Sequence, residues 1–297
     1  PGTYNSIILN GHVPKLVDTA PKSYNISVEQ IAGAISSHTR AILVVHAIGE
    51  PIDMTPIMKL ADEKNIFVIE DCSQAHGATI KGKLVGTFGH IAAFSTGFKK
   101  NHVTNGSGGI VYSNNIEFFQ TAVALADRGK PIWRKDYDDR NPTNYLFPAL
   151  NLNTHEISCS IGLLSLAKLP DNIKRRNEFV AILSEKITSL GGACSPYKMS
   201  ENFSPFFLPV HFNESGFQQN AEEFSLAVRA EGIPLNPHYN YVASRWKWLK
   251  DYLVDMGPCL NAENMIDTSF NLYLNENYQK LEANDICLAI RKVEKNF

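Results

Sequence analysis

The sequence predicts an α/β protein in which a mostly parallel β-sheet is covered by helices. Three short runs, residues 41–46, 66–69 and 91–94, are apolar throughout except for the terminal His46, which is typical of strands that are buried on both faces. Helical patterns such as residues 55–64 separate these runs. With 297 residues and 44% hydrophobic content, the chain is long enough for one large domain and a smaller one.

Local signals assign the other elements of the first half. Residues 27–30, SVEQ, have the spacing of a capping box and predict the start of a helix. Residues 129–153 are polar, aromatic and without periodicity, so we expect a long surface excursion there. The remaining predicted elements are a strand over residues 13–18, a hairpin over 78–84, a strand over 110–112 and a helix over 116–128.

The second half begins with helices and predicts a separate small domain. Apolar residues on one face predict a helix over residues 156–169, which Pro170 is expected to end. A second helix follows over residues 171–190, and a glycine pair closes it. We therefore expect a large domain over residues 1–190 and a smaller α+β domain over residues 191–297. The elements predicted for the small domain are a strand over residues 206–212 and helices over 221–231 and 283–295.

Charge and composition argue against several kinds of partner. The formal net charge of −2 gives no electrostatic attraction to nucleic acid or to an anionic membrane. No apolar stretch of the sequence approaches the ~18 residues of a membrane span. The five cysteines are widely spaced and include no C-x-x-C pair, so we expect neither a disulfide framework nor a metal site, and a cytoplasmic location.

Polar residues follow two of the apolar runs at the points where these runs end. Asp71 closes the second run, and Ser95 and Lys100 follow the third. A lysine, a carboxylate and a hydroxyl suit pyridoxal phosphate (PLP), because they can bond its aldehyde, protonate its pyridine nitrogen and hold its phosphate. Each also has a structural interpretation, since paired loop lysines are usually solvated and a carboxylate can simply end a strand. The glycines match neither the dinucleotide-binding pattern nor the nucleoside-triphosphate loop.

The segment around these residues resembles a known family. Residues 69–95, IEDCSQAHGATIKGKLVGTFGHIAAFS, with Lys100 five residues further, are similar to the sugar aminotransferases of the DegT/DnrJ/EryC1/StrS family. Three more segments resemble the family in the same order: HTRAILVVHAIGEPIDM, ALNLNTHEISCSIGLLSLAKL and NAENMIDTSFNLYL. The resemblance covers nearly the whole chain and implies the PLP-dependent transferase fold of type I.

The resemblance implies a role for each matching residue. Asp71 matches the carboxylate that pairs with the pyridine nitrogen, and Gln74 matches the residue packed beside the cofactor ring. Ser95 matches the phosphate-binding serine, and Lys100 matches the lysine that forms the Schiff base and then moves the proton. Asn151 matches an asparagine that reaches the phosphate of the neighbouring subunit, which implies a homodimer with shared active sites.

The resemblance also implies the reaction. Family enzymes transfer an amino group, usually from glutamate, to a keto group on a nucleotide-linked deoxysugar. His238 and Tyr239 lie where the small domain of the family often contributes to sugar binding. Related dehydratases carry His in place of the lysine, so Lys100 favours transamination over dehydration. A third possibility is a non-catalytic relative that binds a sugar nucleotide or a protein partner.

One expected part of the site has no match in the sequence. In the family, a phosphate-binding helix start and an aromatic residue that stacks on the pyridine ring both precede the position of Thr3. This implies either a chain without its N-terminal portion or a relative with a weakened cofactor site.

Overall fold

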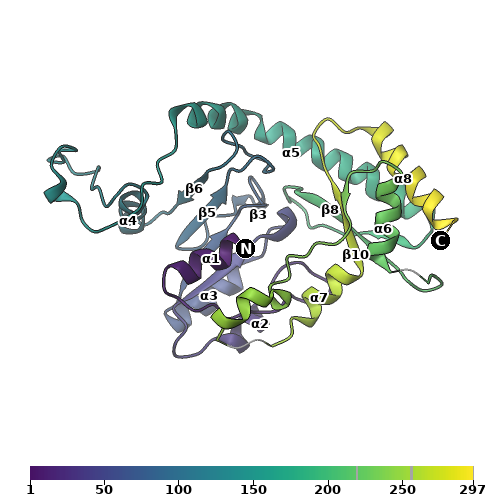
Figure 1. Ribbon diagram of the computed structural model, residues 1–297, viewed down its shortest axis with the longest axis horizontal. Helices are drawn as coiled ribbons and strands as arrows, with labels where there is room; N and C mark the ends of the chain where they lie inside the picture. The colour runs from purple at the N-terminus through teal and green to yellow at the C-terminus, as the bar shows by residue number, and fades with distance from the viewer. Residues whose placement is uncertain (219, 255–256, 297) are drawn as a thin grey trace.

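The first half of the chain forms a four-stranded sheet with the order β1-β2-β5-β6. The computed structural model describes residues 1–218, 220–254 and 257–296 (Figure 1). The strands are β1 (Ala41–Val45), β2 (Phe67–Asp71), β5 (Ile91–Ser95) and β6 (Gly109–Tyr112). The first three strands are parallel, and β6 is antiparallel to β5. The mostly parallel sheet predicted from the apolar runs is confirmed.

Helices and a hairpin pack on one face of this sheet. The Ser27 side chain accepts a hydrogen bond from the N–H of Gln30 at the start of the first of these helices, where the capping-box spacing predicted it. The packed elements are α2 (Val28–Ala34), α3 (Met54–Lys64) and the hairpin β3 (Thr79–Ile80) with β4 (Lys83–Leu84). The buried residues they share with β1 and β2 are mostly aliphatic and include Ile31, Ile42, Val44, Met54, Ile57 and Val68.

A long excursion follows the first sheet. After α4 (Ile116–Ala126), residues 127–155, all of which the structure describes, contain only the short 3-10 helix Pro142–Asn144 and one isolated pairing of Asp127 with Asn151. In Figure 1 this teal segment extends away from the rest of the molecule. The excursion predicted over residues 129–153 is confirmed.

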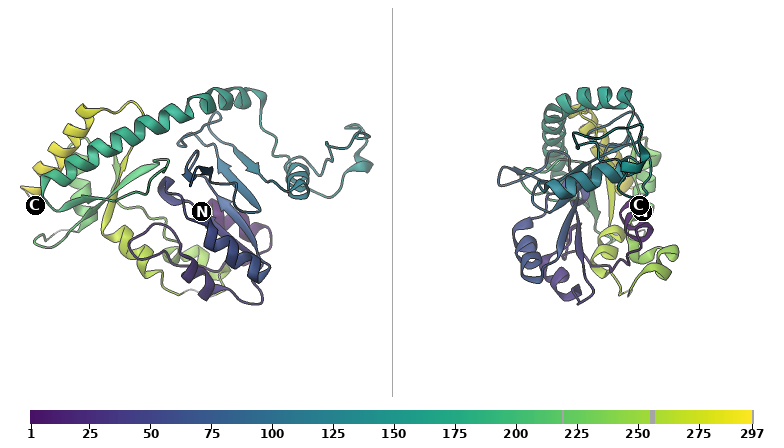
Figure 2. Two further views of the ribbon diagram at one scale, coloured as in Figure 1. Left: turned by 180° about the vertical axis from the view of Figure 1, so that it is seen from behind. Right: turned by 90° about the vertical axis from the view of Figure 1, so that its left-hand side faces the viewer.

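The prediction that Pro170 ends a helix is wrong. A single helix, α5 (Glu156–Leu190), continues through Pro170 for 35 residues and reaches from the first sheet to the second (Figures 1 and 2). Proline removes one backbone donor and costs roughly 3 kcal/mol inside a helix. Pro170 itself is exposed, while the neighbouring Leu169 is buried, so packing of the flanking turns offsets the cost of the proline.

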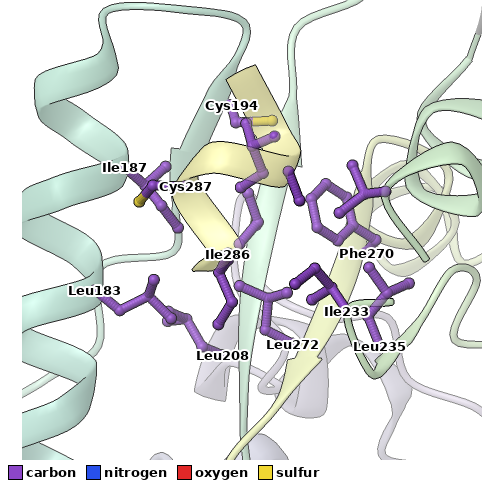
Figure 3. Close-up of a cluster of buried hydrophobic side chains, with 14 of the residues drawn as sticks. Leu183, Ile187, Cys194, Leu208, Ile233, Leu235, Phe270, Leu272, Ile286 and Cys287 are labelled. Carbon is purple, nitrogen blue, oxygen red and sulfur yellow. The ribbon is translucent and has the colours of Figure 1, made fainter. Parts of the chain in front are cut away.

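The second half of the chain forms an antiparallel sheet with the order β7-β8-β10-β9. Its strands are β7 (Cys194–Pro196), β8 (Phe207–Phe212), β9 (Leu235–Asn236) and β10 (Ser269–Tyr273). The helices α6 (Ala221–Ala230) and α8 (Lys280–Glu294) and the end of α5 pack against it. Figure 3 shows Leu183 and Ile187 of α5 facing the sheet residues Leu208 and Leu272 within one buried cluster.

The predicted strand over residues 13–18 is also wrong. This segment has no regular secondary structure and lies against α7 (Leu260–Asp267), because the carboxylate of Asp18 accepts hydrogen bonds from the backbone N–H groups of Asn261 and Ala262. A short helix that the sequence did not predict, α1 (Gly2–Leu9), precedes it.

We propose that the two sheets are the cores of the two domains expected on either side of Gly191, with the second half of α5 packing on the small domain. Gly191 ends α5 in a left-handed conformation. Within the described ranges, no helix combines the length and the apolar character needed to cross a membrane.

Candidate active site

The parallel strands of the first sheet bring polar residues to one edge. Asp71 is the last residue of β2, and Ser95 is the last residue of β5, where it pairs with Gly109 of β6. Gln74 and Lys100 lie in the loops that leave these two strands. Four of the residues singled out from the sequence therefore lie at the carboxyl edge of the sheet.

Asp71 is held by two donors and keeps acceptor sites free. Thr3 donates its hydroxyl to Oδ2 at 2.9 Å, and the backbone N–H of Ser73 donates to Oδ1 at 3.1 Å. Because a carboxylate offers about four acceptor sites, it can accept a further donor. No sequence signal pointed to Thr3 as a contact, because it lies on the unpredicted helix α1, 68 positions from Asp71.

Lys100 lies in a partly buried position. Burial lowers the pKa of its ammonium group, and the negative charge of Asp71 opposes this shift. The amine nitrogen Nζ lies 4.9 Å from the centre of the Phe206 ring, which comes from the segment just before β8. Lys99, by contrast, is exposed, and its amine lies 5.5 Å from the exposed ring of Phe98. The two neighbouring lysines thus occupy different environments.

Gln74 connects the first sheet to the segment that follows β9. Its Oε1 accepts a hydrogen bond from the backbone N–H of Ile48 at 2.7 Å, and its Nε2 donates to the hydroxyl of Tyr239 at 3.0 Å. Burial raises the pKa of Tyr239 to about 12, although the hydrogen bond from Gln74 opposes the shift. The N–H of Ile48 fixes the orientation of the amide, so Nε2 is directed at Tyr239.

The turn after β1 is strained. Ile48 lies in the left-handed region with φ of 57° and is fully buried, which is rare for a β-branched residue. The next residue, Gly49, has φ of 92°, and a Cβ there would lie 1.8 Å from the carbonyl oxygen of Ser204. Ser204 and Phe206 donate their N–H groups to the carbonyls of Gly49 and Ile48 at 2.9 and 3.1 Å. The contact with the segment before β8 therefore holds this turn.

Behind the edge lies a buried hydrogen-bonded pair, His46 and Glu70, that the sequence did not reveal. His46 Nε2 lies 3.1 Å from Glu70 Oε2, and both side chains are inaccessible to solvent. Glu70 also accepts the backbone N–H groups of Gly86, Phe88 and Gly89. Burial alone would raise the pKa of Glu70, but the hydrogen bonds from His46, Gly89 and Gly86 outweigh it and lower this pKa.

The same cluster has the composition of a possible metal site. Ligand atoms of His46, Glu70 and Cys72 lie within 4.8 Å of one another. However, His46 Nδ1 accepts the N–H of Ile52 at 3.1 Å, and both oxygens of Glu70 are occupied by donors. We interpret the cluster as a hydrogen-bonded support for the strand ends.

A second cluster holds the residue that follows Lys100. Asn101 accepts a hydrogen bond from Arg176 Nη1 at its Oδ1 and donates from Nδ2 to Ser204 Oγ at 3.0 Å. Arg176 also forms an ion pair with Glu276 at 2.9 Å and donates to the carbonyl oxygen of Pro205. This cluster joins the Lys100 loop, α5 and the segment before β8.

The other residues singled out from the sequence lie apart. Asn151 is exposed beside the end of α4, and the structure gives it no hydrogen bond to Asp71, Gln74 or Lys100. The ring nitrogens of His238 lie 3.4 Å from Asp267 and 3.8 Å from Glu222. Of the substrate candidates, only Tyr239 contacts the edge residues.

Comparison with known proteins agrees with this arrangement. A sequence model described as the DegT/DnrJ/EryC1/StrS aminotransferase family matches residues 1–291. The chain belongs to this family. An uncharacterized protein of Methanocaldococcus jannaschii is 30% identical over 99% of this chain and 76% of its own length. The GDP-perosamine synthase of Escherichia coli O157:H7 is 36% identical over 63% of this chain and 49% of its own length.

Solved structures of the DegT/DnrJ/EryC1/StrS family have the same fold. An aminotransferase from Psychrobacter cryohalolentis has a TM-score of 0.88 and 26% identity, with coverage of 98% of this chain and 78% of that one. A GDP-4-keto-6-deoxy-D-mannose-3-dehydratase of Escherichia coli with bound hydrated PLP has a TM-score of 0.86, and covers 97% of this chain and 76% of its own. At 20% identity, this second likeness shows the fold alone. Sequence relatives of the chain include proteins named as dehydratases, among them the dTDP-4-dehydro-2,6-dideoxy-D-glucose 3-dehydratase of Saccharopolyspora spinosa. The predicted PLP-dependent transferase fold is confirmed.

The chemistry of the edge fits the cofactor of the DegT/DnrJ/EryC1/StrS family. PLP requires an amine for its aldehyde, a carboxylate for its pyridine nitrogen and donors for its phosphate. The edge offers an amine of lowered pKa in Lys100, a carboxylate with free acceptor sites in Asp71, and the hydroxyl of Ser95.

Proposed function

We propose that this chain is a PLP-dependent aminotransferase that moves an amino group from an amino acid, most simply glutamate, to a keto group of a nucleotide-linked deoxysugar. The observation that carries the proposal is the placement of Lys100 and Asp71 at the same sheet edge, where burial lowers the pKa of the lysine. The family membership of the chain and the name of its relative from Escherichia coli O157:H7 support the reaction class.

Each edge residue has a distinct task in this proposal. When bound, PLP supplies an aldehyde for the amino group and a protonated ring that withdraws electrons. Lys100 would bond the aldehyde and then accept and return the substrate proton, for which a neutral amine is required. Asp71 would hold the proton on the pyridine nitrogen, and Ser95 would donate to the phosphate. Gln74 would orient the ring edge, because its amide is fixed by Ile48.

Tyr239 and His238 are proposed to bind the sugar of the substrate. Tyr239 lies in hydrogen-bond contact with Gln74, so it is adjacent to the proposed cofactor position. His238 sits between the carboxylates of Asp267 and Glu222, which suit sugar hydroxyl groups better than phosphate.

Borohydride trapping tests the cofactor assignment. The full chain incubated with PLP and reduced with borohydride is expected to carry the cofactor on Lys100, as read by peptide mass spectrometry. Lys100→Ala should abolish the adduct, whereas the matched control Lys99→Ala should retain it. An adduct that persists in Lys100→Ala would move the assignment to another lysine, and no adduct in the unaltered protein would favour a non-catalytic relative.

The product distinguishes transamination from dehydration. With glutamate and a nucleotide-linked 4-keto-6-deoxysugar, the aminotransferase should form an amino sugar and 2-oxoglutarate. A dehydratase would instead release a 3-deoxy product and would not accumulate an amino sugar. We expect the amino sugar because the edge offers a lysine amine.

We also propose a homodimer in which Asn151 reaches the site of the partner subunit. Apolar side chains that are more than half exposed gather on the excursion, on the first half of α5 and near the Lys100 loop: Phe98, Leu150, Leu152, Ile157, Leu163 and Leu164. Sedimentation of the purified protein should give a dimer, and Leu164→Glu should shift it toward monomers. A monomeric unaltered protein would refute the proposal.

A further inference from the structure

The amine of Lys100 has an aromatic partner. Its Nζ lies 4.9 Å from the centre of the Phe206 ring, within the ~6 Å over which a ring face attracts a cation. In the ranges that the structure describes, no carboxylate oxygen forms an ion pair with this amine, although Asp71 acts on it from a greater distance. The ring face is therefore the direct partner of the free amine.

Phe206 is held in this position from two sides. Its backbone N–H donates to the carbonyl of the strained Ile48 at 3.1 Å. On the other side, the carbonyl of Pro205 accepts hydrogen bonds from Arg176 and Asn101, both at 3.3 Å. The ring also packs against Phe207 with centres 5.4 Å apart. The small domain thus presents one fixed aromatic ring to an amine that belongs to the large domain.

We propose that Phe206 is a positioning residue for Lys100, whose ring face attracts the protonated form of the lysine amine and so confines this amine to one place when it carries no substituent. The inference deepens the proposed function, because it rests on Lys100 being the reacting amine. While its amine carries no covalent substituent, a flexible lysine can adopt many rotamers. A ring attached to the small domain confines the amine to one place and makes its position depend on the contact between the domains.

Asp71 is the charged group that acts on the pKa of Lys100, and other titratable groups lie around the Lys100 loop. Asp71 on β2 favours the ammonium, and burial of the lysine disfavours it. Burial, with the neighbouring His102 and Lys100 adding to it, lowers the pKa of His76 to about 4, so this histidine is neutral near pH 7. Arg176 approaches through Asn101, but Glu276 balances its charge. None of these groups changes when only Phe206 is substituted.

Competitive labelling of lysines as a function of pH tests the contact directly. The full chain, treated with hydroxylamine to free the lysines of any aldehyde, would be reductively methylated over a pH series and read by fragment-resolved mass spectrometry. Phe206→Leu and Phe206→Met keep the apolar volume but remove the ring face. We expect both to lower the pH midpoint of Lys100 labelling by about half a unit to one unit, because the ammonium loses its partner.

Two further variants separate positioning from packing. Phe206→Tyr retains the ring face and should retain the midpoint, and Phe98→Leu removes only the ring beside the exposed Lys99 and should leave Lys100 unchanged. Equal midpoints in Phe206→Leu and the unaltered chain would overturn the proposal, as would equal shifts in Phe206→Leu and Phe206→Tyr. Borohydride trapping with PLP in the same variants tests the proposed function separately. The role of Phe206 and the role of Lys100 in binding PLP can therefore be refuted independently.

Discussion

Gln74 links the first sheet to the second half of the chain at the candidate site. Its amide oxygen satisfies the N–H of Ile48, and its amide nitrogen donates to Tyr239, 165 positions away. Methionine has nearly the same length and no strong acceptor or donor. Gln74→Met is therefore expected to lower the free energy of unfolding by about 1–3 kcal/mol, because a buried N–H loses its acceptor. Urea unfolding measures this cost.

Tyr239→Phe is the matched control for this residue. It removes the hydrogen bond from Gln74 Nε2 to the tyrosine hydroxyl and leaves the hydrogen bond from Ile48 to Gln74 intact. We expect a smaller loss, about 0.5–1.5 kcal/mol. If Tyr239→Phe were as costly as Gln74→Met, the bond to Ile48 would contribute nothing.

Glu70 makes stability depend on pH. Hydrogen bonds from His46 and the backbone lower its pKa in the folded protein, so the unfolded chain binds its proton more readily. This contribution is fully present above the unfolded pKa of about 4.3 and is lost as the pH falls through the folded pKa.

Glu70→Gln tests that dependence. The side-chain amide would direct its own N–H groups toward backbone N–H donors that lose their acceptor, so we expect a loss of about 1–3 kcal/mol at pH 7. Urea unfolding at pH 7 and near pH 3 should show a difference between variant and unaltered protein that narrows at the lower pH. A difference independent of pH would mean that Glu70 is not charged in the folded state.

Single residues also show how much of the candidate site could be predicted. The spacing of Asp71, Gln74, Ser95 and Lys100 along two strand ends placed them at one edge, because parallel strands end together. Thr3, Ile48 and Phe206 carried no such signal. They reach the edge through tertiary contacts between distant segments, which no local pattern encodes.

Among the elements, strands and short helices with strong local patterns were predicted almost to the residue, as for α3 and β5. The failures are segments whose conformation depends on distant packing. Residues 13–18 were predicted as a strand, but Asp18 binds the start of α7 instead. The helix-ending rule for Pro170 failed because neighbouring turns of α5 are buried against other elements.

The proline within α5 gives a prediction at this scale. Pro170→Ala restores a backbone donor in an exposed part of the helix, so we expect the free energy of unfolding to rise by about 1–3 kcal/mol. Pro142→Ala, at the start of the 3-10 helix Pro142–Asn144, should change it little, since proline is well tolerated there. Thermal or urea unfolding of both variants provides the comparison. If Pro142→Ala raised the free energy of unfolding as much as Pro170→Ala, the effect would arise in the unfolded chain and not in the helix.

At the scale of the whole molecule, the two sheets meet at the segment before β8, which contacts the turn at Ile48 on one side and Asn101 on the other. The carboxylate of Glu50 extends this contact by accepting hydrogen bonds from Tyr197 and Ser200. The candidate site thus lies where the parts of the chain that carry the two sheets touch, and a change in this contact would alter the position of Phe206 relative to Lys100.

Arg176 offers a test of that coupling. Its guanidinium joins Glu276, Asn101 and the carbonyl of Pro205, and only 14% of its side chain is exposed. Arg176→Ala leaves the carboxylate of Glu276 and the Oδ1 atom of Asn101 without this donor, while the carbonyl of Pro205 keeps the hydrogen bond from Asn101. We therefore expect a loss of about 1–3 kcal/mol in the free energy of unfolding. Hydrogen exchange at the N–H groups of Ser204 and Phe206 should accelerate, because their segment loses an anchor.

The neighbouring Arg175 is the matched control for Arg176. It pairs with Asp171 one turn away on α5, and both side chains are more than half exposed, so Arg175→Ala should cost no more than about 0.5 kcal/mol. It should also leave the exchange at Ser204 and Phe206 unchanged. Equal acceleration in the two variants would show that helix stability, and not the contact between the domains, controls the segment that carries Phe206.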